Sequence, residues 1–143
     1  APRLAPRVAE AIAQADLIIL APGDLYSSIL PNLLVAGMQE ALQKSHGRIV
    51  AIINRSTKKG ETHGFSTKDF YDIYQRALGA TPLHTMIIDD GSVALPAESE
   101  SVHHDPAEFQ NITVDMHCHD LGDSENPAYI DGAKAARAIV AMA

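Results

Sequence analysis

Three hydroxyl side chains follow a glycine turn directly after a short apolar run, and this spacing suits the binding of an anion. The run Leu17–Leu20 is followed by Pro22 and Gly23, and the hydroxyls of 26–28 come next. A strand, a glycine turn and a helix start place unpaired N–H groups and the positive end of the helix dipole at the carboxyl edge of a sheet. We therefore predict a phosphate site over Gly23–Ser28, with a purely structural turn as the alternative.

A second polar loop is expected at the same edge. Asn54 follows the apolar segment Arg48–Ile53, and residues 55–66 form a long polar connection with two glycines. Loops of this length in compact domains are often functional. The Asn54 amide can contact a base, a sugar or a phosphate, and an Asx-turn is the alternative. Lys58 and Lys59 can receive a phosphate, although a solvated pair is the commoner arrangement.

The histidines of the string VDMHCHD suggest a different chemistry. On a strand, His117 and His119 would point to the same face, as in the first metal pair of many metal-dependent hydrolases. Such enzymes take further ligands from later strands, and no histidine follows His119. We therefore predict surface histidines and no metal site, while the roles of His103 and His104 stay open. Cys118 is expected to be a small core residue.

Alternating apolar segments predict the elements that would position these loops. Ser66 and Asp69 have the spacing of a helix cap, and Gly79 ends the same helix. Residues 92–106 show no periodic pattern and are expected to be irregular. The predicted strands are 17–21, 48–53, 84–89 and 111–117, and the predicted helices are 7–15, 27–34, 36–45, 67–78 and 131–142. This alternation is typical of parallel strands joined by crossovers.

Composition narrows the classes of protein further. The 143 residues suffice for one domain, and a hydrophobic content of 46% suffices for a core. A net charge of −7 argues against a nucleic-acid partner, and no apolar run is long enough for a membrane span. A single cysteine cannot form an internal disulfide, which fits a reducing compartment, so we expect a cytoplasmic protein. Because no membrane span is predicted, we expect no membrane partner.

Two strings resemble the signature loops of the family that unites 2-phospho-L-lactate transferases with bacterial gluconeogenesis factor proteins. APGDLYSSILPNLLV is similar to the family string GPGSLYTSILPNLLV, with Asp24 in place of Ser and Ala21 in place of Gly. Residues 54–66 resemble NxMTQPGETDGYS, with Lys58-Lys59 in place of Gln-Pro and His63 in place of Asp. The Tyr-Ser-Ser form of the first string is closer to the gluconeogenesis factor branch.

The resemblance implies an α/β fold, a Rossmann-like three-layer sandwich with a mostly parallel sheet. It implies that residues 1–143 form a single α/β domain that is the C-terminal part of a larger nucleotide-binding domain. The family's glycine-rich GGGTG-type loop belongs to an upstream half that this sequence lacks. The sheet is therefore expected to be incomplete alone, with the missing N-terminal half or a second copy as partner.

The same resemblance implies a function. We expect a regulatory protein that binds a phosphorylated nucleotide or a nucleotide-sugar, such as a UDP-sugar, at the carboxyl edge of the sheet. A transferase that moves a phospho-acid from a guanylyl diester to a deazaflavin, with Mg²⁺ as its cofactor, is one alternative. A metal-dependent hydrolase using His117 and His119 is another, and the chain alone is expected to be inactive. The predicted binding residues are Gly23, Asp24, Leu25, Tyr26, Ser27, Ser28, Asn54 and Thr62.

Overall fold

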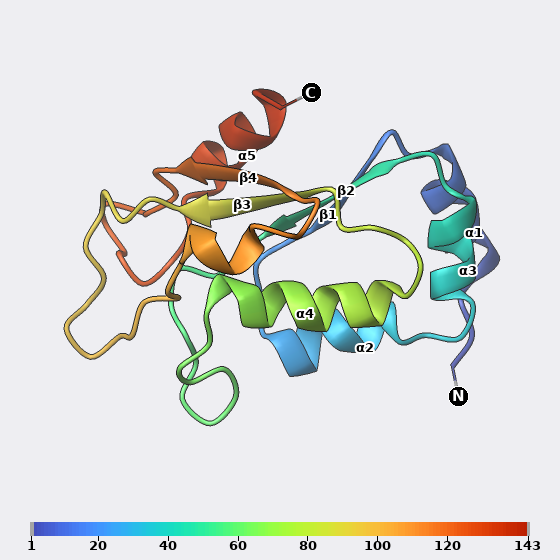
Figure 1. Ribbon diagram of the computed structural model, residues 1–143. Coiled ribbons are helices and arrows are strands. Elements are labelled where there is room, and N and C mark those ends of the chain that lie inside the picture. Colours follow the sequence, from blue (N-terminus) through green and yellow to red (C-terminus); the bar gives the residue numbers. More distant parts are fainter. Residues whose placement is uncertain (1, 143) are drawn as a thin grey trace.

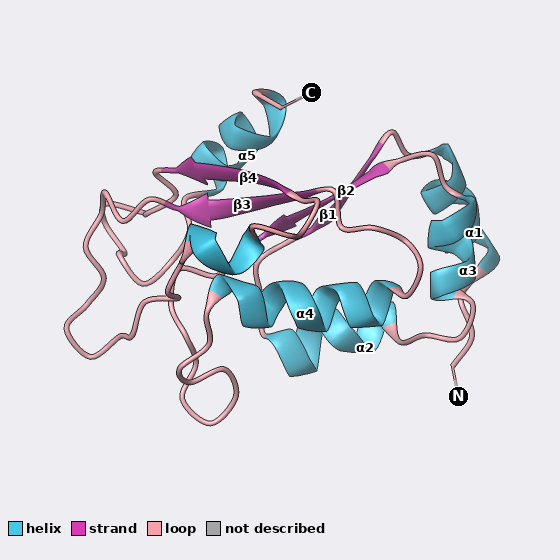
Figure 2. Cartoon of the chain, in the orientation of Figure 1, coloured by secondary structure: helices cyan, strands magenta, loops and turns pink. Residues whose placement is uncertain are grey.

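A parallel sheet forms the middle layer of the protein, whose computed structural model describes residues 2–142 (Figures 1 and 2). Its strands lie side by side in the order of the sequence, and each pairs in parallel with the next. They are β1 (Leu17–Leu20), β2 (Arg48–Ile52), β3 (Thr85–Asp89) and β4 (Asp115–His119). The predicted α/β fold with a parallel sheet is confirmed.

Helices connect and cover these strands. They are α1 (Pro6–Gln14), the π-helical turn η1 (Leu25–Ile29), α2 (Leu30–Leu33), α3 (Met38–Lys44), α4 (Thr67–Leu78), the 3-10 turn η2 (Pro106–Phe109) and α5 (Gly132–Val140). The Ser66 side chain accepts from the Asp69 N–H, and the Asp69 side chain accepts from the Ser66 N–H. Gly79 ends α4 at φ 68°. Capping and termination of α4 are therefore as predicted.

The order of the strands determines which face the crossovers cover. Right-handed crossovers that always advance in one direction place their helices on the same face of a sheet. In Figure 1, α2 and α4 lie on one face and α5 lies on the other. The core of the first face includes Leu33, Phe70 and Ile88, whereas Ala135 and Ala138 of α5 pack on Val50, Ile52 and Ile87 of the second.

The carboxyl ends of all the strands meet at one edge of the sheet. Leu20 pairs with Ala51, Ile52 with Ile87, and Asp89 with His119. The loops that follow these strands emerge together at the left of Figure 1. The prediction that the loops after β1 and β2 share an edge is confirmed, and the loops after β3 and β4 join them there.

The last strand lies further along the chain than predicted. β4 spans Asp115–His119 instead of 111–117. The turn η2 precedes it, and in the connection between them Ile112 and Val114 pack on the core without pairing to β3. Cys118 is exposed, so the expectation of a small core residue was wrong. β4 is the last strand of the sheet, and on an edge strand alternation alone does not bury a side chain.

The segment after β1 also differs from the expected single helix over 27–34. It begins at Leu25 as a π-helical turn and continues as the short helix α2. Gly37 adopts φ 94° directly before α3, which explains the break predicted there. The longest helix, α4, has 12 residues. Among residues 2–142, no helix combines the length and the hydropathy needed to cross a membrane.

Candidate functional site

A cavity of about 450 Å³ lies between the loops that follow β1, β2 and β4. We call it the glycine-loop cavity. It is lined by Pro22, Gly23, Asp24, Asn54, Arg55, Ser56, Thr57, Lys58, Ala128, Tyr129 and Ile130. Its position at the carboxyl ends of parallel strands is where open α/β sheets bind ligands.

The Asn54 amide clamps the glycine turn. Its Oδ1 accepts from the Gly23 N–H at 3.1 Å, and its Nδ2 donates to the Gly23 carbonyl at 3.0 Å. The side chain therefore pairs both backbone groups of one residue in the neighbouring loop. Asn54 shapes the floor of the cavity and does not form the Asx-turn considered above. Gly23 keeps a negative φ, so it serves this close pairing without the left-handed conformation.

The turn after Gly23 offers backbone donors. The N–H groups of Ser28 and Ile29 both donate to the Asp24 carbonyl, at 2.9 and 3.2 Å. The N–H groups of residues 25–27 lie in the first turn of this helix, where N–H groups have no carbonyl acceptor within the helix. Leu25 is 1% exposed and anchors the turn in the core, whereas Tyr26 lies 49% exposed. Leu25 thus positions the turn, and its neighbours face solvent.

Charged side chains close one side of the glycine-loop cavity. Lys58 Nζ lies 2.6 Å from Asp24 Oδ2 and 2.8 Å from Glu61 Oε1. The hydrogen bond from Lys58 holds the pKa of Asp24 below its ordinary value. Thr62 is buried, and its Oγ1 accepts from the Lys58 N–H at 2.8 Å. Thr62 therefore fixes the backbone at Lys58 and does not line the cavity.

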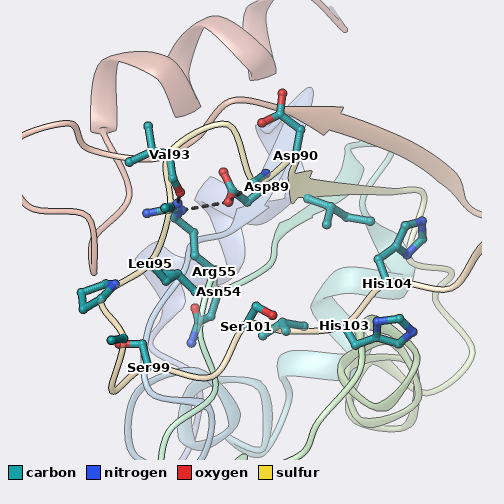
Figure 3. A pocket seen from close by; sticks show the side chains of 16 residues that line it. Asn54, Arg55, Asp89, Asp90, Val93, Leu95, Ser99, Ser101, His103 and His104 are labelled. Carbon is teal, nitrogen blue, oxygen red and sulfur yellow. Dashed lines mark hydrogen bonds and ion pairs between the residues drawn. The ribbon is translucent and has the colours of Figure 1, made fainter.

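A second cavity of about 520 Å³ lies on the other side of Asn54 and Arg55, under the segment 91–104. We call it the histidine cavity, because His103 and His104 lie at one side of it, away from Val93 and Leu95 (Figure 3). It is lined by Asn54, Arg55, Ile88, Asp89, Asp90, Gly91, Val93–Ala97, Ser99 and Ser101–His104.

The loop over the histidine cavity is joined to the loop after β2. Glu100 Oε2 accepts from Thr57 Oγ1 at 2.6 Å and from the Gly64 N–H at 2.9 Å, and His63 Nδ1 lies 3.1 Å away. The hydrogen bond from Thr57 is the main cause that lowers the pKa of Glu100. The Val102 N–H donates to the Arg55 carbonyl at 3.0 Å. Two stretches without helix or strand thus support each other.

Arg55 is the buried centre of the edge. Its side chain is 1% exposed, and its Nε lies 2.9 Å from Asp89 Oδ2 at the end of β3. Its guanidinium also donates to the carbonyls of Val93 and Pro127, which belong to the loops after β3 and β4. Arg55 therefore connects the loop after β2 with the end of β3 and with the loops after β3 and β4. It lines both cavities and lies between them.

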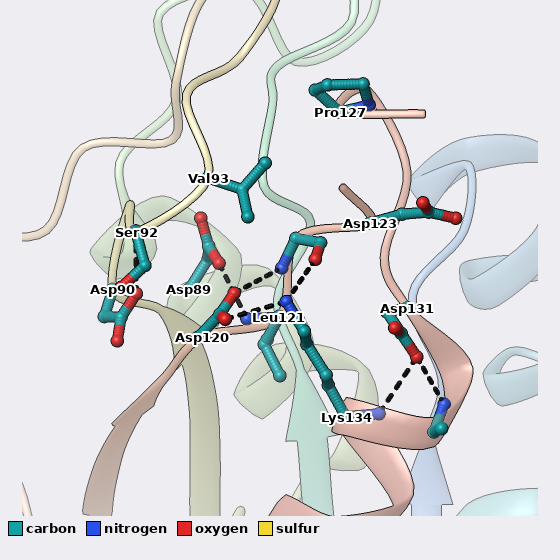
Figure 4. A network of polar contacts seen from close by, with 12 residues as sticks. Asp89, Asp90, Ser92, Val93, Asp120, Leu121, Asp123, Pro127, Asp131 and Lys134 are labelled. Carbon is teal, nitrogen blue, oxygen red and sulfur yellow. Dashed lines mark hydrogen bonds and ion pairs between the residues drawn. The ribbon is translucent and has the colours of Figure 1, made fainter. Parts of the chain in front are cut away.

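Three aspartates converge beside this arginine. Ligand oxygens of Asp89, Asp90 and Asp120 lie within 4.8 Å of one another, a donor set whose chemistry suits Mg²⁺. Asp89 is already paired with Arg55, and Asp120 accepts from Lys134 Nζ at 2.7 Å (Figure 4). That hydrogen bond is the main cause that lowers the pKa of Asp120. Arg55 and Lys134 thus pair with two of the three carboxylates, and those two aspartates already have their counter-ions without a metal.

Within residues 2–142, His117 and His119 belong to no group of three or more side chains close enough to share a metal ion. His117 and His119 share a face as predicted, with parallel rings 6.3 Å apart, but the three aspartates are the group of ligand atoms that converges there. His104 Nδ1 lies 2.9 Å from Thr67 Oγ1. Burial is the main cause that lowers the pKa of His104. The contact with Thr67 is that of a structural histidine.

The structure brings together only part of the predicted set. Gly23, Asp24 and Asn54 line the glycine-loop cavity; Leu25 and Thr62 are buried behind it. The hydroxyls of 26–28 lie on the adjoining turn. Sequence reasoning missed Arg55, for which the only signal was its place beside Asn54 at the end of a strand.

Comparisons with known proteins give a consistent set of relatives. A family model described as "2-phospho-L-lactate transferase CofD" matches residues 1–122. A gluconeogenesis factor of Listeria innocua is 32% identical over 142 residues, which are 96% of this chain and 44% of that protein. A gluconeogenesis factor of Halalkalibacterium halodurans is 52% identical over 60 residues, which are 42% of this chain and 19% of that protein.

A solved structure agrees with the sequence matches. The crystal structure of a UPF0052 family member from Bacillus halodurans superposes with a TM-score of 0.85 at 26% identity, covering 96% of this chain and 47% of that one. The chain thus spans less than half the length of these relatives.

Proposed function

The chain belongs to the 2-phospho-L-lactate transferase CofD family, and on that premise we propose that its glycine-loop cavity binds the phosphates of a nucleotide or nucleotide-sugar. The protein acts as a regulator of the gluconeogenesis factor kind, with a UDP-sugar as the representative ligand. The relatives that carry the gluconeogenesis factor name support this branch.

One observation supports the proposal above the others: the clamp of Asn54 on Gly23. Both hydrogen bonds of the amide fix the backbone of the turn before any ligand arrives. A turn held in one shape keeps the N–H groups of 25–27 aimed in constant directions, which lowers the entropy that a ligand loses on binding. Backbone donors at a helix start suit phosphate oxygens without a formal positive charge.

A transferase is the second candidate, because the description of the matching family model names that activity. The 2-phospho-L-lactate transferase reaction would use the same phosphate site for a guanylyl group. The aspartate group is a poor fit for the Mg²⁺ expected for such a reaction, since Arg55 and Lys134 already pair with two of its three carboxylates. A preference for GDP over UDP would favour the transferase, and the reverse preference the regulator.

Asn54→Asp is expected to weaken nucleotide binding. This change keeps an acceptor for the Gly23 N–H, removes the donor to the Gly23 carbonyl and adds a negative charge to the cavity. We expect the affinity for UDP, GDP and UDP-sugars to fall by about tenfold or more, which corresponds to about 1.4 kcal/mol. Isothermal titration calorimetry on the 143-residue chain measures this affinity directly.

Asn111→Asp is the matched control, because it adds the same charge at an exposed residue outside both cavities. It should leave every affinity unchanged. If Asn54→Asp binds all the nucleotides as tightly as the unaltered chain, the glycine-loop cavity is not their site. A folded protein that takes up none of them would reject the proposed function altogether.

The partner proposed for this chain is a strand that pairs with the free edge of β1. Among the described residues β1 pairs with β2 alone, so its other edge has open backbone donors and acceptors. Ile19 on this strand is 42% exposed. Exposed apolar edges favour pairing with another strand. Either a further part of a longer chain or a second copy of these residues can supply it.

We expect the 143-residue chain to associate in a concentration-dependent way, and Ile19→Lys to reduce that association because it places a charge beside the open edge. Multi-angle light scattering after size-exclusion chromatography measures the effect. Val140→Lys is the control, since Val140 is 74% exposed on α5. A monodisperse monomer at all concentrations would exclude the second copy as the partner.

A further inference from the structure

The glycine-loop cavity contains an ion pair that joins its two signature loops. Lys58 Nζ lies 2.6 Å from Asp24 Oδ2, and both side chains line the cavity and are about half exposed. Asp24 belongs to the turn after β1, and Lys58 belongs to the loop after β2. The pair is therefore accessible to a ligand that enters from solvent.

Both members of this pair are departures from the strings that the chain resembles. Asp24 stands in place of a serine, and Lys58 is the first of two lysines that replace Gln-Pro. Two charges of opposite sign, introduced in separate loops, meet at hydrogen-bond distance. Lys58 compensates the charge of Asp24, which has no other cationic partner among the described residues beside the glycine turn.

The local charge is unfavourable to an anion as long as the pair stays intact. Lys58 contacts two carboxylates, those of Asp24 and Glu61, so the three groups together have one net negative charge. The hydrogen bond to Asp24 is the first cause that raises the pKa of Lys58. Of the residues lining the cavity, Arg55 is also cationic, but it is buried and already paired with Asp89. Lys58 is thus the cation that a ligand can reach.

We propose that Lys58 is the phosphate-binding cation of this cavity and that Asp24 is its internal competitor, so that a phosphate binds by displacing the Asp24 carboxylate from Lys58. This inference rests on the proposed function and adds a rule of selectivity to it. A terminal phosphate with two negative charges displaces a singly charged carboxylate more readily than a phosphodiester does. The site therefore binds a UDP-sugar but favours UDP over it, which titration of the unaltered chain with both ligands measures; equal affinities would overturn this preference.

A double-mutant cycle tests this competition. The chain, Asp24→Asn, Lys58→Gln and the double variant are titrated calorimetrically with UDP and with GDP. Asp24→Asn should bind the better of the two nucleotides about three- to tenfold more tightly, since an exposed ion pair competes weakly. Lys58→Gln should bind it about tenfold more weakly. In the Lys58→Gln background, Asp24→Asn should have little further effect, because no ammonium remains to be released.

Asp72→Asn is the matched control, because it breaks a similar ion pair with Lys68 on α4, and it should not change binding. Unchanged or weaker binding by Asp24→Asn overturns the competition. An equal gain in both backgrounds also overturns it, since Asp24 would then act by general repulsion without Lys58. If none of the four chains binds either nucleotide while circular dichroism shows each folded, the proposed function fails and this inference with it.

Discussion

Arg55→Met is expected to lower the free energy of unfolding by about 3–5 kcal/mol, which is a typical loss when one partner of a buried ion pair is removed. The change leaves Asp89, whose side chain is 11% exposed, without its counter-ion. It also removes the donors to the carbonyls of Val93 and Pro127. Urea unfolding followed by circular dichroism measures the loss as a shift of the midpoint.

Arg48→Met is the matched control for this prediction. Arg48 Nη2 lies 3.1 Å from Asp115 Oδ2, but these side chains are 54% and 65% exposed. Solvent screens such a pair, so the variant should stay within about 1 kcal/mol of the unaltered chain. Equal losses of stability for the two arginine variants would show that the buried contacts of Arg55 contribute no more than an exposed ion pair.

The sheet was predictable because its evidence is local. β1, β2 and β3 are short β-branched runs bounded by turn residues, and β2 and β3 are buried along nearly their whole length, as inner parallel strands are. Ser66 and Asp69 form a capping box that predicts the start of α4 from adjacent residues alone. These features are set within a few residues, so a single sequence suffices to find them.

For the candidate site, the sequence predicted only which loops take part, from the ends of the predicted strands and from the two loop strings. Asn54 was expected to face a ligand, yet its amide is committed to the Gly23 backbone. Arg55 joins loops whose contacts lie 38 and 72 residues away, at Val93 and Pro127. Such contacts depend on the conformation of loops without helix or strand, and hydrophobic periodicity does not predict that conformation. β4 was misplaced for the same reason, since η2 begins at the end of the segment 92–106, for which no pattern predicted an element.

Gly122 offers the second large effect, because it lies where the loop after β4 passes the guanidinium of Arg55. A Cβ at this position would overlap the Cβ of Val93 and lie 2.9 Å from Arg55 Cζ. Val93 cannot yield without moving its own backbone, so Gly122→Ala should lower the free energy of unfolding by about 1–3 kcal/mol, as overpacking does. Urea unfolding of the variant measures this loss.

Gly132→Ala is the control for Gly122→Ala, since a Cβ at the start of α5 meets no atom within 4 Å, and it should leave stability equal or slightly higher. Combining Gly122→Ala with Arg55→Met makes a stricter test. Because the methyl group presses on the guanidinium itself, the loss in the double variant should be smaller than the sum of the two single losses. Strict additivity would mean that the strain at Gly122 arises from Val93 alone and that the packing of Arg55 against this loop contributes nothing.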